Sequence, residues 1–168
     1  MWSLAIFKDM EDIVDLINEF ARNKTTKLCF YIRSISPVKN IHFKINFQET
    51  TVVTFDTPRI GQVLDNLLTN AIKFSPVGGT IEITMESGKG CVRVTVTDEG
   101  PSIKNEDLDN LFQPFNKFGS DPTKKGTGLG LAIAKKMVKL HGGALTFKPS
   151  KNQGASFSFE LPENSPFL

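Results

Sequence analysis

A glycine-rich stretch that runs directly into an apolar helical pattern limits what this chain can fold into. Residues 126–131 read Gly-Thr-Gly-Leu-Gly-Leu, and the apolar run 132–140 follows without a break. Glycines at alternate positions let the backbone approach a bulky anion closely, because no Cβ stands in the way. The following helix points its unpaired N–H groups and the positive end of its dipole at the same place. We therefore expect a phosphate chain to bind here, with a plain loop or packing role as the alternative.

Two common phosphate-binding motifs do not fit this stretch. A Rossmann fingerprint follows a strand directly, whereas here the polar loop 119–125 precedes the glycines. A P-loop needs Gly-Lys-Ser/Thr after four spacer residues, and the chain contains no such run. The phosphate site must therefore be completed by residues from elsewhere in the chain.

Composition indicates one globular domain over residues 1–168. Hydrophobic residues make up 39% of the chain and charged residues 23%, which is typical of a domain with its own core. The formal net charge of +2 is too small to indicate a nucleic-acid or membrane partner. No apolar run approaches the roughly 20 residues of a membrane helix, and residues 1–7 lack the basic flank of a signal peptide. We expect a cytoplasmic location, unless the chain is an excised fragment.

The spacing of apolar residues predicts alternating helices and strands. Cys29 and Cys91 fall in strand-like runs and are expected to be buried free thiols. Thr57 offers a capping hydroxyl just before Pro58, and His42 is expected to face solvent. His141 is expected to close its helix with help from the dipole. The predicted helices are 9–22, 57–74, 105–111 and 132–140, and the predicted strands are 27–33, 41–47, 51–55, 80–85, 92–97, 144–148 and 155–161.

A polar stripe lies on the predicted helix 57–74. Gln62, Asn66, Asn70 and Lys73 are four, four and three residues apart, so they share one face. A solvated face would be the simplest explanation, but asparagine forms helices poorly, and two of them one turn apart carry a local cost. The stripe therefore favours a binding role.

Two further features suggest a ligand site. Asp98 ends a strand and is followed by Glu-Gly-Pro, so its carboxylate is either placed for a ligand contact or forms a turn. The segment 112–125 is a long polar loop, and loops of this size are usually mobile or functional.

Four short segments of the sequence follow one another in a recognisable order. They are residues 66–74 (Asn-Leu-Leu-Thr-Asn-Ala-Ile-Lys-Phe), 98–103 (Asp-Glu-Gly-Pro-Ser-Ile), 112–115 (Phe-Gln-Pro-Phe) and 126–131. In order, spacing and flanks they resemble the N, G1, F and G2 boxes of the ATP-binding catalytic domain of sensor histidine kinases, whose superfamily includes gyrase, MutL and a heat-shock chaperone. The resemblance covers about residues 55–161. It implies an α/β two-layer sandwich, with a mixed, mostly antiparallel sheet covered on one face by about three helices.

The resemblance implies a role for each matched position. Asn70 would coordinate Mg²⁺, Lys73 would meet phosphates, and Asp98 would accept a hydrogen bond from the adenine amine, which selects ATP over GTP. Gly100 would let the backbone pass close to the base, three phenylalanines would anchor a mobile lid, and Ser156 would support Asp98 directly or through water. The other positions implied to bind ATP are Asn66, Ser102, Ile103, Phe112, Phe115, Phe118, Lys125, Gly126, Thr127, Gly128, Leu129, Gly130 and Leu131.

Asn66 bears on whether the site would hydrolyse ATP or transfer its γ-phosphate. ATPases of the superfamily carry a glutamate four residues before the metal asparagine, where it activates water. An amide cannot serve as a base, so hydrolysis should be slow and the γ-phosphate kept for another acceptor. The implied catalytic residues are Asn66, Asn70 and Lys73.

Three features depart from the family pattern. Ser102 replaces the second glycine of the G1 box, and a serine would be strained there by about 1 kcal/mol or more if the position needs positive φ. Residues 27–55 form two alternating runs where one is expected. Neither His42 nor His141 lies in a phosphoacceptor-like setting, so we expect the phosphoacceptor and dimerisation helices to be absent from this chain. Either the chain is a fragment, or its acceptor is another protein.

The resemblance implies that the domain donates the γ-phosphate of Mg-ATP to a histidine on a dimerisation domain, with a response regulator downstream. Ser102 motivates a nucleotide-binding pseudokinase or interaction module as one alternative. A protein-serine kinase of the anti-sigma-factor type is another, because it shares these boxes and also lacks the histidine helix. A stand-alone ATPase ranks last because of Asn66.

Overall fold

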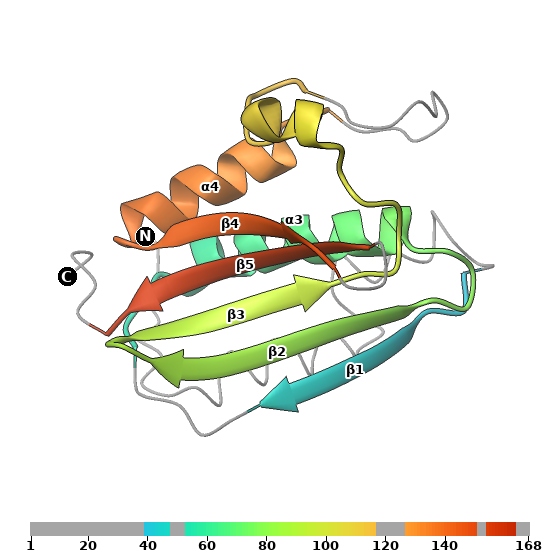
Figure 1. Ribbon diagram of the computed structural model, residues 1–168. Coiled ribbons are helices and arrows are strands. Elements are labelled where there is room, and N and C mark those ends of the chain that lie inside the picture. Colours follow the sequence, from blue (N-terminus) through green and yellow to red (C-terminus); the bar gives the residue numbers. More distant parts are fainter. Residues whose placement is uncertain (1–38, 48–52, 117–126, 151–153, 164–168) are drawn as a thin grey trace.

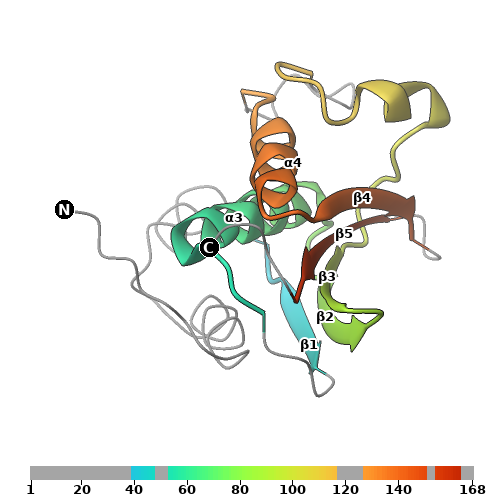
Figure 2. The ribbon, with the colours of Figure 1, turned by 90° about the vertical axis from the view of Figure 1, so that its left-hand side faces the viewer.

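The computed structural model describes residues 39–47, 53–116, 127–150 and 154–163. A five-stranded sheet forms one layer, and the helices α3 and α4 lie over one of its faces (Figure 1). Seen edge-on in Figure 2, both helices lie on the same side of the strands. The elements are β1 (His42–Phe47), α3 (Thr57–Phe74), β2 (Thr80–Gly88), β3 (Cys91–Thr97), the 3₁₀ helix η1 (Asn105–Asn110), α4 (Gly130–Leu140), β4 (Ala144–Pro149) and β5 (Ala155–Pro162).

The sheet is mixed and mostly antiparallel, as predicted. The strand order is β1-β2-β3-β5-β4. Edge strand β1 pairs with β2 in parallel, and the other neighbouring pairs are antiparallel. With η1, the two α-helices make the expected three helical segments in the described residues. None of the helices in those ranges is long and apolar enough to span a bilayer.

The core lies between the sheet and the two helices. Alternate residues of the strands face inward, and α3 contributes residues at three- and four-residue spacing. Burial of each large apolar side chain is worth about 1.5–3 kcal/mol. The buried side chains include Ile81, Ile83, Met85, Val92, Val94, Val96, Phe157, Phe159 and Leu161 of the sheet, Ile60, Val63, Leu64, Leu67, Leu68 and Ala71 of α3, and Ala134 and Val138 of α4.

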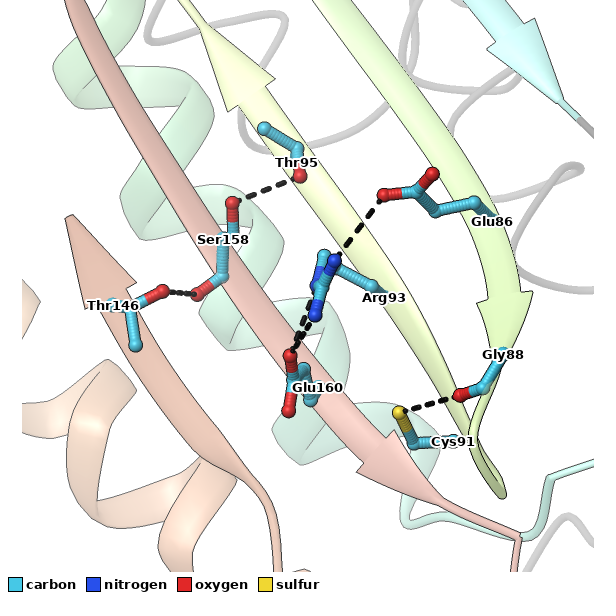
Figure 3. Close-up of polar contacts among 8 residues, drawn as sticks. All are labelled: Glu86, Gly88, Cys91, Arg93, Thr95, Thr146, Ser158 and Glu160. Atoms are coloured by element: carbon cyan, nitrogen blue, oxygen red, sulfur yellow. Dashed lines mark hydrogen bonds and ion pairs between the residues drawn. The ribbon is translucent and has the colours of Figure 1, made fainter. Parts of the chain in front are cut away.

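The outer face of the sheet is polar, and many of its side chains bond to one another (Figure 3). Arg93 Nε donates to Glu160 Oε1 at 2.9 Å, and Glu86 lies on the other side of the same guanidinium. The hydroxyls of Thr95 and Ser158 are 2.9 Å apart. Exposed pairs of this kind stabilise a sheet only modestly, so this face reads as a solvated surface.

Three sequence predictions need correction. The strand predicted over 51–55 is wrong for its described part, because residues 53–55 form no strand. Val53 and Phe55 are nevertheless buried in the core, so the apolar run indicated burial rather than pairing. Cys91 is half-buried rather than buried, and its thiol donates to the Gly88 carbonyl at 3.1 Å.

The third correction concerns the start of α3. Asp56, and not Thr57, caps this helix: its Oδ1 accepts the Arg59 N–H at 3.1 Å. The Thr57 hydroxyl is buried without a hydrogen-bond partner in the described structure. The predicted helix 9–22, the strand 27–33 and Cys29 lie outside the described residues.

Candidate functional site

The polar stripe of α3 meets the start of α4. A Cβ at position 130 would lie 3.0 Å from Asn66 Oδ1, so Gly130 leaves the space that the amide occupies. Asn66 Nδ2 is buried, and within the described residues it has no hydrogen-bond partner. No side chain caps the first turn of α4, which leaves its N–H groups for an anion. The amide donor and this helix start therefore face the same place.

Asn70 and Lys73 follow on the same face of α3, toward its C-terminal end. Asn70 is half-buried, and no hydrogen bond of its side chain is seen among the described residues. The Lys73 ammonium lies 5.0 Å from the centroid of the Phe74 ring. One face of α3 thus presents two amides and a cation within two helical turns.

Asp98 is a buried carboxylate at the end of β3. It is 4% exposed, and its Oδ1 accepts the Gly100 N–H at 2.8 Å and the Ala155 N–H at 3.4 Å. Its Oδ2 has no hydrogen bond to any described residue. Burial raises the pKa of Asp98 above its ordinary value of 3.8, and the two N–H bonds lower it without cancelling that rise. A half-satisfied buried carboxylate favours a ligand contact over a turn.

The G1 block packs against the end of α3. A Cβ at position 100 would lie 2.7 Å from the Phe74 carbonyl oxygen and 2.8 Å from Asp98 Oδ1. Gly154 packs even more closely, because a Cβ there would lie 1.7 Å from the Asp98 carbonyl oxygen. Glycine at both positions lets three segments converge on one carboxylate.

Backbone contacts join the F and G2 blocks at the base of the lid. The Phe115 N–H donates to the Gly128 carbonyl at 3.0 Å. Gly128 has a φ of 72°, and a Cβ there would lie 2.7 Å from the Asn116 carbonyl oxygen. Only glycine meets both conditions at low cost.

The phenylalanines assigned to the lid differ in burial. Phe112 packs on the core, and the Lys135 ammonium lies 4.6 Å from the centroid of its ring. The Phe115 ring is 73% exposed and its φ is 67°. The expectation that this ring anchors the lid is therefore wrong, since Phe115 contributes its backbone. Phe118 lies outside the described residues, as do Lys125 and Gly126.

Two other expectations are corrected. Ser156 does not bond Asp98 directly, because its hydroxyl pairs with that of Thr97 at 3.0 Å, and the Ala155 N–H contacts the carboxylate. Support of Asp98 by Ser156 through water stays a prediction. Ser102 is not strained by a left-handed backbone, because the described non-glycine residues with positive φ are Lys89 and Phe115.

Ile103 and Leu131 pack against the core. Thr127 is exposed, and its hydroxyl accepts the Leu129 N–H at 3.4 Å.

The two histidines lie outside this constellation. His42 is exposed on edge strand β1, as expected. His141 is fully buried: its Nε2 accepts the Asp56 N–H at 3.0 Å, and its Nδ1 donates to the Met137 carbonyl at 2.8 Å. The ring is thus held in the neutral tautomer protonated on Nδ1. His141 closes α4 as its C-cap residue, as expected, and its ring also connects the end of α4 to the start of α3.

Comparisons with known proteins agree with this arrangement. A model of the histidine kinase-, DNA gyrase B- and HSP90-like ATPase family matches residues 55–165. The sensor protein KdpD of Clostridium acetobutylicum is 37% identical over 161 residues, which cover 94% of this chain but only 17% of KdpD.

Solved structures are also similar. The catalytic domain of the histidine kinase ThkA is 35% identical with a TM-score of 0.72, over 90% of this chain and 94% of that chain. ThkA in complex with the response regulator protein TrrA is 32% identical with a TM-score of 0.70, over 95% of this chain and 42% of that chain. The chain belongs to the histidine kinase-, DNA gyrase B- and HSP90-like ATPase family, as an ATP-binding catalytic domain of the sensor histidine kinase type.

Proposed function

We propose that this domain binds Mg-ATP between α3, α4 and the end of β3, and donates the γ-phosphate to a histidine on a separate dimerisation domain. The observation that carries the proposal is the convergence of unsatisfied polar groups in one region. Asn66 Nδ2 is buried without a described partner, and the buried Asp98 carboxylate has a raised pKa. Such groups cost free energy in the empty protein, and a ligand that pairs with them recovers that cost.

Asp98 would recognise adenine. Because Oδ1 is held by the N–H groups of Gly100 and Ala155, the carboxylate is fixed, and Oδ2 can accept the exocyclic amine. Guanine presents a carbonyl at the equivalent place and offers no donor, so it would leave the carboxylate unpaired. Gly100 would bring the backbone close to the base.

Asn66 Nδ2, Lys73 and the backbone amides of Gly128 and Gly130 would hold the phosphates, with Lys125 and Gly126 completing the lid. Asn70, which makes no described side-chain bond, would offer its amide oxygen to Mg²⁺. Within the described ranges no group of three or more His, Cys, Asp or Glu could hold a metal ion, which fits an ion bound largely through phosphate oxygens and water. The ion would neutralise phosphate charge during transfer.

The chain's own residues would position the phosphates rather than react with them, as phosphoryl transfer requires. Asn66 cannot act as a base toward water. His141 is also excluded as the acceptor, because both ring nitrogens are already bonded and the side chain is buried. The phosphate would therefore pass to a histidine on a partner domain, and a response regulator would receive it next.

Incubation with γ-labelled ATP tests this proposal. The chain alone should stay unlabelled and release little phosphate, and adding a histidine-bearing helical domain of a sensor kinase should give an acid-labile label on that domain. Strong labelling of the isolated chain that disappears with His42→Ala would contradict it. An acid-stable label would instead indicate the serine-kinase alternative. ATP binding without any transfer to the added domain would indicate a nucleotide-binding pseudokinase, and absence of ATP binding an interaction module.

A further inference from the structure

We propose that Lys39 is a positioning residue of the nucleotide site, because it holds the last turn of α3 in place. Its ammonium donates to three carbonyls at that end of the helix: Ile72 at 3.0 Å, Lys73 at 2.9 Å and Ser75 at 2.6 Å. This inference rests on the proposed function.

The chemistry of a helix end explains why a lysine suits this place. The last carbonyls of a helix have no intrahelical partner, and they carry the negative end of the helix dipole. A partly buried ammonium donates hydrogen bonds to the unpaired carbonyls, and its positive charge stabilises the negative end of the dipole. Lys39 is 33 to 36 residues away from these carbonyls in the sequence, so it fixes α3 from outside the helix.

The clamped turn belongs to the proposed site. Asn70 and Lys73 lie at this end of α3, directly before the clamp. The Phe74 carbonyl is not among these three contacts. A Cβ at position 100 would lie only 2.7 Å from its oxygen. The Gly100 N–H in turn holds Asp98 Oδ1 at 2.8 Å. A shift of this turn would therefore displace the residues proposed for both phosphate and adenine.

Lys39 lies outside the family match, which covers residues 55–165. It precedes β1, whose His42 N–H donates to the Gly79 carbonyl in the loop after α3. Lys39, which lies in the part of the chain that departs from the family pattern, thus holds the C-terminal end of α3.

The experiment compares Mg-ATP affinity by calorimetry in folded variants. Lys39→Met removes the charge and the donors, and we expect about a tenfold or greater loss of affinity, in the range seen when supporting contacts are removed. Lys39→Arg keeps a charge and several N–H donors, so it should recover most of that loss. Lys44→Met is the matched control, because Lys44 is an exposed lysine of β1 paired with Glu82 at 3.0 Å; it should bind as the parent does.

Unfolding is measured for each variant first, so that lost stability is separated from lost affinity. If Lys39→Met folds poorly, the folded Lys39→Arg variant still tests the idea, because a guanidinium cannot reproduce all three ammonium contacts and should cost about two- to threefold in affinity. Parent-like affinity in both folded variants would overturn the inference, as would an equal loss in Lys44→Met. A parent chain that does not bind Mg-ATP would instead overturn the proposed function.

Discussion

The two ends of the α3–α4 pair differ in how their polar groups are satisfied. At the closed end, where α3 begins and α4 finishes, the buried His141 ring bonds the Asp56 N–H and the Met137 carbonyl. At the open end, Asn66 Nδ2 has no described partner, and Asp98 carries a buried charge. The Thr57 hydroxyl is an exception at the closed end. The closed end satisfies most of its polar groups internally, whereas the open end leaves groups with which the proposed ligand would pair.

The largest expected effect is at the open end. Asn70→Ala should lower phosphotransfer to an added histidine domain by about 100-fold or more, since a positioned group of this kind is worth roughly 3 kcal/mol in the transition state. Gln62→Ala is the control, because Gln62 is exposed on the same helix. A rate for Asn70→Ala within twofold of this control would remove Asn70 from the site.

The next effect tests the closed end. His141→Ala should lower the free energy of unfolding by about 3 kcal/mol, because it leaves a cavity and an unpaired Asp56 N–H. Denaturant unfolding measures this loss. The folded fraction should still bind Mg-ATP within about twofold of the parent, and a tenfold fall in affinity at unchanged stability would erase the distinction between the two ends.

A smaller effect is expected at the base of the lid. Gly128→Ala places a Cβ on a backbone with a φ of 72° and against the Asn116 carbonyl, at a cost of about 1–2 kcal/mol. We expect nucleotide affinity to fall about tenfold, and the midpoint of thermal unfolding to fall by about 2–8 °C because the folded state carries the strain. Ala132→Gly, within α4, would lower stability without this loss of affinity.

The pH dependence should be the smallest effect. Because the pKa of Asp98 is raised in the folded chain, its contribution to stability is complete below the unfolded pKa and is lost as pH rises through the folded pKa. Mg-ATP affinity should fall as the pH is lowered, because the Asp98 carboxylate then takes up a proton. This protonation occurs at a pH above the ordinary pKa of 3.8. Calorimetry at stepped pH measures this, and Asp98→Asn should lack this component of the change.

The sequence allowed much of this fold to be predicted, because local periodicity determines which residues face the core. The inward alternation of β2, β3 and β5 and the packed stripe of α3 follow from spacing alone. The strand predicted over 51–55 failed for residues 53–55 because apolar residues can be buried without pairing. The cap of α3 was misplaced by one residue, since Asp56 and Thr57 are both good capping residues.

Contacts between distant segments could not be predicted in the same way. Nothing near Lys39 in the sequence indicates that it reaches the end of α3. His141 was assigned only a local role, although its partner Asp56 is 85 residues away. Ser156 was placed near Asp98 correctly, but the cross-strand pairing of β3 and β5 gives its hydroxyl to Thr97.

The most direct test of the contrast between the two ends is Asp98→Asn, measured for both Mg-ATP affinity and stability at pH 7. If the new amide oxygen keeps the Gly100 and Ala155 N–H bonds, its NH₂ group faces the adenine amine and two donors oppose each other. We predict about a 100-fold loss of affinity, with a free energy of unfolding equal to or above that of the parent because a buried charge is removed. Unchanged affinity together with lower stability would show that Asp98 is structural and contradict the account.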